Sequence, residues 1–184
     1  MTSLSDITAI AVNLEPIGDA FLDGLYDVDV SAKYYRFLYR IARFVNPSLT
    51  VELGVATGRS TAHLAAACAS GTVFAVDTDP LDDVCEVLRR FSNIQLRQEE
   101  STSEKLLNSV SERSVDICFV DTVHEFYQAK KETRLWMPKL RIGGLLLYDD
   151  ININEGMRQF WEQLNLDKLS LPELHYTGFG VAIV

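Results

Sequence analysis

Three aspartates follow two apolar segments of this chain, and their position makes them candidates for chemistry. Residues 115–120 form an apolar run that ends in Asp121. Residues 144–148 form a second run, which ends in Asp149 and Asp150. If the two runs are neighbouring parallel strands, the three carboxylates meet beyond the carboxyl edge of the sheet, where ligands bind. They then repel one another unless protons or a cation neutralise them. Oxygen ligands suit Mg²⁺, Mn²⁺ or Ca²⁺, so the spacing predicts a divalent-metal site.

A glycine-rich segment, Gly54 to Gly58, joins the apolar run at 49–53 to the helix predicted after it. Glycines allow a tight turn and a close approach of the backbone to a ligand. The helix N-terminus behind the turn favours a carboxylate or a phosphate. The Gly-x-x-x-Gly spacing matches neither the dinucleotide-binding fingerprint nor a phosphate-binding loop ending in Gly-Lys-Ser/Thr. A plain tight turn is therefore an equally good interpretation of this segment alone.

Asp77 ends the next apolar run, 73–76, and Asp79 follows it closely. An acid at this place can accept hydrogen bonds from the hydroxyls of a ribose. The alternative is that the acids from Asp77 to Asp79 cap the following helix. We expect Asp77 to bind a ligand and Asp79 to cap the helix.

Apolar periodicity and turn residues predict that helices and strands alternate through most of the chain. The predicted strands are 49–53, 72–76, 94–97, 115–120, 144–148, 173–177 and 180–184. The predicted helices are 31–45, 58–69, 81–91, 103–110, 125–137 and 154–164. This alternation predicts a doubly wound, mostly parallel, seven-stranded α/β sheet. Only residues 178–179 separate the last two predicted strands, so we expect those strands to form a C-terminal antiparallel hairpin.

The length of 184 residues favours one main domain, which we place at residues 31–184. Residues 1–30 contain six acids and no Lys or Arg, with scattered apolar pairs. We expect them to form a partly helical N-terminal arm or lid. A solvated tail with one docked turn is the alternative.

The net charge of −9 argues against non-specific binding to nucleic acid or to an anionic membrane. No signal peptide or membrane-spanning run is recognisable. The odd number of widely spaced cysteines (Cys68, Cys85 and Cys118) fits neither a zinc site nor a disulfide framework. We therefore expect a cytoplasmic protein, with a homo-oligomer left open.

Taken together, the motifs resemble the class I S-adenosylmethionine-dependent methyltransferases over residues 31–184. The resemblance rests on Glu52-Leu53-Gly54-Val55-Ala56-Thr57-Gly58, Val76-Asp77, Val120-Asp121, Gly143-Gly144 and the terminal hairpin. It implies a Rossmann-like methyltransferase fold. The glycine turn would hold the methionine part of the cofactor, Asp77 the ribose, and Ser101 in the loop after the third strand the adenine. The implied cofactor-binding residues are Glu52, Gly54, Ala56, Thr57, Gly58, Ser60, Asp77, Ser101 and Asp121.

The aspartates narrow this resemblance to the Mg²⁺-dependent small-molecule O-methyltransferases. The chain is nearest to the branch that acts on macrolide sugars and more distantly similar to catechol-type enzymes. The resemblance implies that Asp121, Asp149 and Asp150 hold Mg²⁺ or Mn²⁺. It also implies that His124, three residues after Asp121, is the general base. Catechol-type enzymes carry Asp-Asn where this chain has Asp149-Asp150, which favours a sugar or polyketide acceptor and leaves phenols open.

The function expected from these residues is methyl transfer from S-adenosylmethionine to a hydroxyl group of a small molecule, with His124 and Asp121 as catalytic residues. A neutral imidazole can take the hydroxyl proton near pH 7. Alternatives remain at this stage: His124 as a surface or capping residue, and Asp149-Asp150 as helix caps. We expect His63 and His175 to be structural and Tyr34 to belong to helix packing.

Other functions of the whole chain also remain open. One is a metal-binding member of the same fold with hydroxylase-like chemistry. Another is a cofactor-binding protein without catalysis. A dinucleotide-dependent dehydrogenase is less favoured, because Ala56 stands where its fingerprint requires a second glycine.

Overall fold

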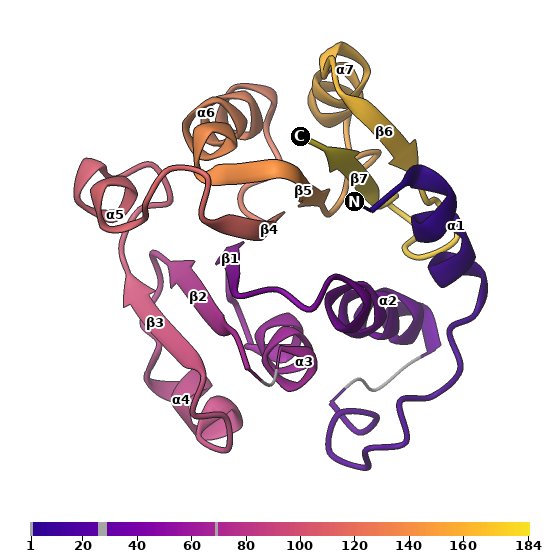
Figure 1. Cartoon of the computed structure of the whole chain (residues 1–184), viewed down its shortest axis with the longest axis vertical. Coiled ribbons are helices and arrows are strands. Elements are labelled where there is room, and N and C mark those ends of the chain that lie inside the picture. Colours follow the sequence, from indigo (N-terminus) through magenta and orange to yellow (C-terminus); the bar gives the residue numbers. More distant parts are fainter. Residues whose placement is uncertain (1, 26–28, 69) are drawn as a thin grey trace.

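A computed structural model describes residues 2–25, 29–68 and 70–184, in which helices and strands alternate (Figure 1). The helices are α1 (Leu4–Val12), α2 (Asp29–Val45), α3 (Arg59–Ala67), α4 (Asp82–Leu88), α5 (Glu104–Ser109), α6 (Phe126–Trp136), the 3₁₀ helix η1 (Met137–Lys139) and α7 (Glu155–Gln163). The strands are β1 (Leu49–Leu53), β2 (Thr72–Asp77), β3 (Ile94–Gln98), β4 (Val115–Val120), β5 (Leu140–Tyr148), β6 (Asp167–Ser170) and β7 (Gly180–Ile183). Strand β5 begins at Leu140, ahead of the predicted residue 144.

The strands form one seven-stranded sheet in the order β3-β2-β1-β4-β5-β7-β6. Strands β1 to β5 run parallel to one another, whereas β7 runs antiparallel to both β5 and β6. The predicted fold class is confirmed: a mostly parallel sheet closed by an antiparallel C-terminal pair. The direction in which the chain adds strands reverses between β1 and β4, and ligands bind at such reversal points in open α/β sheets.

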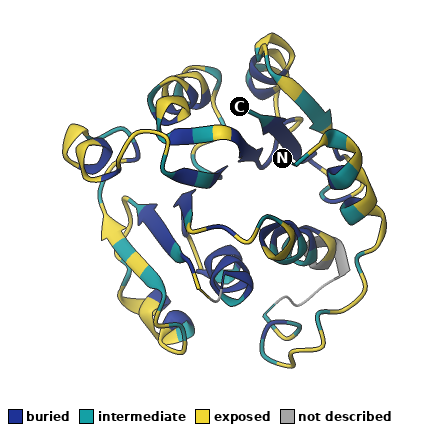
Figure 2. Cartoon of the chain, in the orientation of Figure 1, coloured by how far each residue is buried: buried dark blue, intermediate teal, exposed yellow. Residues whose placement is uncertain are grey.

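Helices cover both faces of the sheet (Figure 1). Helices α1 to α4 share one hydrophobic cluster with the sheet, and α5 to α7 share the other. Side chains alternate between these clusters along β4: Phe119 packs in the first and Cys118 in the second. Because both faces are covered, the central strands are buried almost throughout (Figure 2), which explains their continuous apolar sequences.

The last antiparallel pair differs from its prediction. Residues 173–177 form no strand, and the partner of β7 is the more polar segment β6. Pro172 has no N–H to donate to a ladder, and Leu174 turns back to donate to the Leu171 carbonyl oxygen at 3.2 Å. A loop of residues 171–179 therefore joins β6 to β7. The sequence pattern missed β6 because an edge strand does not need apolar side chains on every position.

The described part of residues 1–30 contains α1, a segment with turns at residues 20–24, and the start of α2. In α1, Ser3 and Asp6 form a capping box, and Ile7 is fully buried. The Asp23 carboxylate accepts hydrogen bonds from the N–H groups of Ile17 and Gly18. Residues 26–28 lie outside the described residues, and α2 begins ahead of the predicted domain boundary, so the division at residue 30 stays a prediction. Among the helices that the structure describes, none has the length and apolar character needed to cross a membrane.

Candidate active site

Asp77, at the end of β2, holds the backbone of the glycine turn. Its Oδ2 accepts hydrogen bonds from the N–H groups of Val55 at 2.7 Å and Ala56 at 2.9 Å, and its Oδ1 accepts one from Asp79 at 3.0 Å. Partial burial opposes ionisation, but backbone donors outweigh it and hold the pKa of Asp77 below its ordinary value. The carboxylate is therefore charged at neutral pH and ties β2 to the turn after β1.

The acids after β2 and β5 do not cap the helices that follow them. Leu81 occupies the N-cap position of α4 and makes no side-chain cap bond, so the expected capping role of Asp79 is wrong. At α7 the cap is Asn154, whose side chain accepts a hydrogen bond from the Met157 N–H at 2.9 Å. Both helices begin too far along the chain for these acids, because a cap directly precedes the first helical residue. Capping therefore does not account for Asp149 and Asp150.

Backbone conformation and close packing favour glycine at both ends of the turn without any ligand. Gly54 and Gly58 have φ angles of 93° and 74°. A Cβ atom on Gly54 would lie 1.8 Å from the Asp121 carbonyl oxygen, and one on Gly58 would lie 2.6 Å from a methyl group of Val84. The first contact reflects the close approach of β1 and β4, and the second that of α3 and α4.

A cavity of about 540 Å³ opens at the carboxyl ends of the central strands. Gly54, Asp77, Ser101 and Asp121 of the predicted cofactor-binding set line it. The remaining members of that set are absent from its lining: Glu52, Ala56, Thr57, Gly58 and Ser60. The volume falls in the range typical of small-molecule sites, so the structure brings the ends of β1, β2 and β4 together around a space of suitable size.

Glu52 is fully buried in β1, and burial raises its pKa to about 8. The Ser60 and Thr61 hydroxyls lie close enough to oppose this shift. Within the described chain, however, no hydrogen bond of normal geometry reaches either carboxyl oxygen. Glu52 is therefore protonated at neutral pH.

The buried carboxylate of Glu132 organises one wall of the cavity. Its Oε1 accepts hydrogen bonds from the Ser101 hydroxyl at 2.5 Å and from Gln128 Nε2 at 2.8 Å, and its Oε2 accepts one from the Thr122 hydroxyl at 2.9 Å. Trp136 donates from Nε1 to the Ser101 carbonyl oxygen at 2.9 Å. Ser101 is therefore fixed by α6, and its hydroxyl proton is already engaged.

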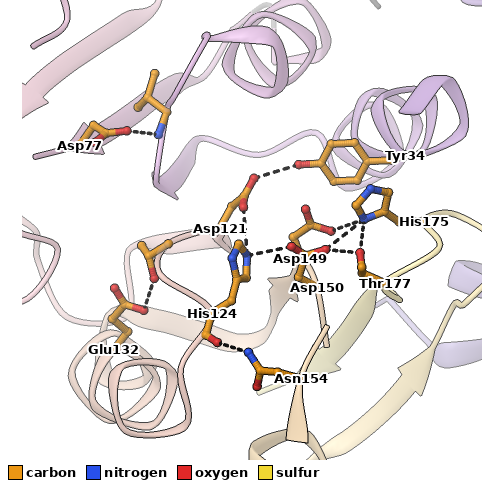
Figure 3. A network of polar contacts seen from close by, with 12 residues as sticks. Tyr34, Asp77, Asp121, His124, Glu132, Asp149, Asp150, Asn154, His175 and Thr177 are labelled. Carbon is orange, nitrogen blue, oxygen red and sulfur yellow. Dashed lines mark hydrogen bonds and ion pairs between the residues drawn. The ribbon is translucent and has the colours of Figure 1, made fainter. Parts of the chain in front are cut away.

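Asp121, Asp149 and Asp150 meet two histidines beyond the ends of β4 and β5 (Figure 3). His124 Nε2 lies 3.2 Å from Asp121 Oδ1 and 3.6 Å from Asp150 Oδ2. His175 Nδ1 lies 3.3 Å from Asp149 Oδ1 and 3.1 Å from Asp150 Oδ1. The strand register explains the meeting, because Val120 pairs with Tyr148 and so the residues that follow them are adjacent.

The potential ligand atoms of this cluster form two overlapping sets. One set contains Asp121, His124 and Asp149, and the other contains Asp149, Asp150 and His175. Within each set the ligand atoms lie within 4.8 Å of one another. Asp149, which is 7% exposed, belongs to both sets.

Burial and the contacts between the charged groups of the cluster shift the pKa values of its histidines and aspartates. Burial opposes protonation of His124, but the hydrogen bond and charge of Asp121 outweigh it and raise the pKa of His124 above its ordinary value. The close contacts with the carboxylates of Asp149 and Asp150 raise the pKa of His175 to about 10. Burial raises the pKa of Asp149. Asp150 is also partly buried, but hydrogen bonds from His175 and Thr177 hold its pKa low. The cluster therefore carries both imidazolium and carboxylate charges.

Neighbouring groups fix the cluster in place. Tyr34 on α2 donates from its hydroxyl to Asp121 Oδ2 at 3.2 Å, and Thr177 donates to Asp150. Asn154 donates from Nδ2 to the His124 carbonyl oxygen at 2.9 Å. His124 and Asp150 have φ angles of 45° and 57°, which non-glycine residues adopt rarely and which concentrate at functional sites.

Sequence reasoning missed three residues that the structure brings to this region. His175 and Tyr34 contact the aspartates, and Glu132 contacts Ser101. His175 was hidden by the wrong strand prediction at 173–177. Glu132 and Thr133 are charged or polar residues on the buried face of α6, and that pattern is the signal that could have indicated a buried polar role.

Comparison with known protein families supplies the deciding observation. Residues 51–151 match the model of a family described as a methyltransferase domain. The chain belongs to this family. The matched region of the methyltransferase domain extends from β1 to the residue after Asp150, so it contains Asp77, Asp121 and both aspartates after β5.

Solved structures share the fold of this methyltransferase domain. An O-methyltransferase from Bacillus cereus in complex with SAH has a TM-score of 0.73 at 19% identity, covering 98% of this chain and 97% of that one. An SAH-bound methyltransferase from Podospora anserina has a TM-score of 0.72 at 16% identity, covering 97% and 93%. The fold is that of the class I S-adenosylmethionine-dependent methyltransferases, which confirms the predicted resemblance at this level.

A curated relative is much longer than the methyltransferase domain described here. The uncharacterized protein y4gI of Sinorhizobium fredii is 29% identical over 155 residues. The match covers 74% of this chain but only 17% of that protein.

Proposed function

We propose that this chain transfers a methyl group from S-adenosylmethionine to a hydroxyl group of a small molecule, assisted by Mg²⁺ or Mn²⁺. The observation that carries the proposal is that Asp121 belongs to both the cavity and the cluster of aspartates and histidines. This residue lines the cavity at the ends of β1 and β2, and it also belongs to the carboxylate and histidine cluster. A methyl donor in the cavity and an acceptor oxygen at the cluster would therefore be neighbours, as a direct transfer requires.

Asp77 supports the cofactor part of the proposal. Asp77 lines the cavity, and its ionised carboxylate accepts hydrogen bonds on both oxygens. We propose that it also accepts a hydrogen bond from a ribose hydroxyl at the edge of the cavity. The SAH-bound structures of the same fold support the same ligand class. S-adenosylmethionine would supply an electrophilic methyl group.

Asp121, Asp149 and Asp150 fit a divalent cation. Asp149 is buried, and its Oδ1 accepts no hydrogen bond of normal geometry from any residue that the structure describes. Charged, desolvated oxygens without donors are the ligands that a hard cation prefers. The cation would act as a Lewis acid that makes an acceptor hydroxyl easier to deprotonate.

His124 is the proposed general base. In this role the Asp121 carboxylate would stabilise the imidazolium that forms after proton uptake, since Oδ1 lies 3.2 Å from Nε2. Asn154 holds the His124 backbone from the start of α7. Sugar, polyketide and phenol hydroxyls are the proposed acceptors.

A transfer assay with isotopically labelled S-adenosylmethionine tests the proposal. The purified chain is incubated with a panel of sugar, polyketide and phenol acceptors, with Mg²⁺, with Mn²⁺ or with excess chelator. We expect labelled product that depends on the cation and is lost in Asp149→Asn. Glu112→Gln, an exposed acid on the loop before β4, should retain the full rate. Full activity in chelator would refute the cation, and tighter binding of NAD than of S-adenosylmethionine would refute the cofactor.

A further inference from the structure

We propose that His175 supplies a nitrogen ligand to the cation site, through Nδ1 and together with Asp149 and Asp150. The site would then take a first-row transition ion such as Mn²⁺ in preference to Mg²⁺. The inference rests on the proposed function in that it concerns the same cation. It is nevertheless testable by binding alone, without turnover.

Distances within the set agree with coordination of one ion. Ligands on adjacent corners of an octahedron with bonds of about 2.1 Å lie about 3.0 Å apart. His175 Nδ1 lies 3.1 Å from Asp150 Oδ1 and 3.3 Å from Asp149 Oδ1. Both distances from Nδ1 are thus close to the spacing of adjacent ligands, and the ligand atoms of the set all lie within 4.8 Å of one another.

Burial makes an ion the natural partner of Asp149. Its side chain is 10% exposed, and the contact of its Oδ1 with His175 is an ion pair whose geometry is too poor for a hydrogen bond in the described chain. A buried carboxylate oxygen that receives no proper donor costs free energy unless a cation satisfies it. No described side chain satisfies this oxygen of Asp149 with a hydrogen bond of good geometry, so a bound cation is the partner that fits it best.

The fold holds His175 in place for this role. The loop 171–179 is tied to the rest of the protein, because Leu171 donates to the Phe179 carbonyl oxygen and Asn152 donates to the Thr177 carbonyl oxygen, both at 2.7 Å. The imidazole also lies against the ring of Tyr34, with 5.8 Å between the ring centroids. Thr177 Oγ1, which donates to Asp150, lies 2.7 Å from Nδ1 and orients this edge of the ring toward the aspartates (Figure 3). The proton that Nδ1 donates to Thr177 would be released to solvent when an ion binds.

Ligand chemistry sets the preference among ions. Mg²⁺ is a hard ion that favours oxygen, whereas imidazole suits the transition metals. Replacing one oxygen by an imidazole nitrogen therefore shifts selectivity from Mg²⁺ toward the transition series. The competing interpretation is that His175 is an internal cation that neutralises Asp149 and Asp150 in place of a metal. The two interpretations predict opposite effects of removing the imidazole.

Mn²⁺ binding followed by electron paramagnetic resonance decides between them. The wild-type chain is titrated with Mn²⁺, and pulsed spectra are recorded to detect hyperfine coupling between the Mn²⁺ electron spin and a histidine nitrogen. We expect coupling in the wild type and in His124→Ala. In His175→Ala we expect the coupling to be lost and Mn²⁺ affinity to fall by at least about 10–100-fold. His175→Asn should lose the coupling but recover part of the affinity, because its amide oxygen lies near the position of Nδ1.

Glu173→Gln is the control for disturbance of the loop, since this side chain is exposed on the same loop, and it should keep both affinity and coupling. Unchanged or tighter Mn²⁺ binding by His175→Ala would establish the internal cation and overturn the inference. Loss of the nitrogen coupling in His124→Ala but not in His175→Ala would overturn the inference as well. It would show that the ion binds to the other set of ligands, Asp121, His124 and Asp149. In either case the proposed methyl transfer stands if Mn²⁺ binding still depends on the three aspartates. Absence of methyl transfer in a chain that shows His175 coupling would refute the proposed function alone.

Discussion

Asp121 takes part in two sets of contacts at once. Its carbonyl oxygen faces Gly54, its Oδ2 accepts from Tyr34, and its Oδ1 lies beside His124. A substitution there would disturb the cavity and the cluster together. His124 and Asp77 each belong to one of these regions only, so they separate acid-base chemistry from cofactor binding.

His124→Ala should lower kcat by about 10²–10⁴-fold, the usual contribution of a general base. SAH affinity should stay unchanged, because His124 does not line the cavity. The base acts in its neutral form, and its pKa is raised. The wild-type rate should therefore increase with pH through a pKa above the ordinary histidine value. Steady-state rates against pH and calorimetry with SAH check both points. An unchanged rate and pH profile would return His124 to a structural role.

Asp77→Asn should weaken SAH binding by about 1.5–3 kcal/mol, since charge-assisted hydrogen bonds to the turn and to the ribose lose their charge. Asp83→Asn removes the same charge from the exposed side of α4 and should bind SAH like the wild type. Calorimetric titration of both variants measures the difference. Equal affinities in the two variants would rule out a role of Asp77 in the cofactor site.

At the scale of elements, the contact of β1 with β4 determines where the cavity opens. Gly54→Ala places a Cβ against the Asp121 carbonyl oxygen and must force these strands apart. Gly18 also has a positive φ but has open space around it, so Gly18→Ala isolates the cost of the backbone conformation. We expect Gly18→Ala to lose about 1–2 kcal/mol of unfolding free energy. Gly54→Ala should lose at least about 1–3 kcal/mol more.

Urea unfolding of the two glycine variants measures this difference. A similar loss in both would mean that the backbone conformation, and not the strand contact, requires glycine at position 54.

At the scale of the whole molecule, the buried carboxyl group of Glu52 links stability to pH. Its pKa is about 8 in the folded chain and near 4.5 when exposed, so the folded state favours the protonated form. Its contribution is full below pH 4.5 and is lost as the pH rises to about 8. Glu52→Gln should therefore be more stable than the wild type at pH 8.5, by up to a few kcal/mol, and similar to it at pH 4.5.

Denaturant unfolding of the wild type, Glu52→Gln and the exposed control Glu112→Gln at both pH values tests this prediction. The control should follow the wild type throughout. A constant difference between Glu52→Gln and the wild type across this pH range would contradict the raised pKa.

Local sequence was sufficient to determine the alternation of α-helices and strands from α2 to α7 and the strand-end positions of Asp77, Asp121, Asp149 and Asp150. Buried parallel strands have continuous apolar sequences, and the polar residues that end them mark the carboxyl edge of the sheet. The glycine spacing likewise located the first turn. These features depend on residues close together in the chain, so the chain shows them without a structure.

Contacts between distant segments were decided only by the tertiary structure. His175 reaches Asp149 and Asp150 because the loop 171–179 folds over the end of β5, and Tyr34 reaches Asp121 from α2. The polar strand β6 is specified by its pairing with β7 and has no periodic signal of its own. Glu132 acquires its role from three partners that lie in other parts of the chain or one turn away. Such roles arise from packing geometry, which no local pattern of residue types records.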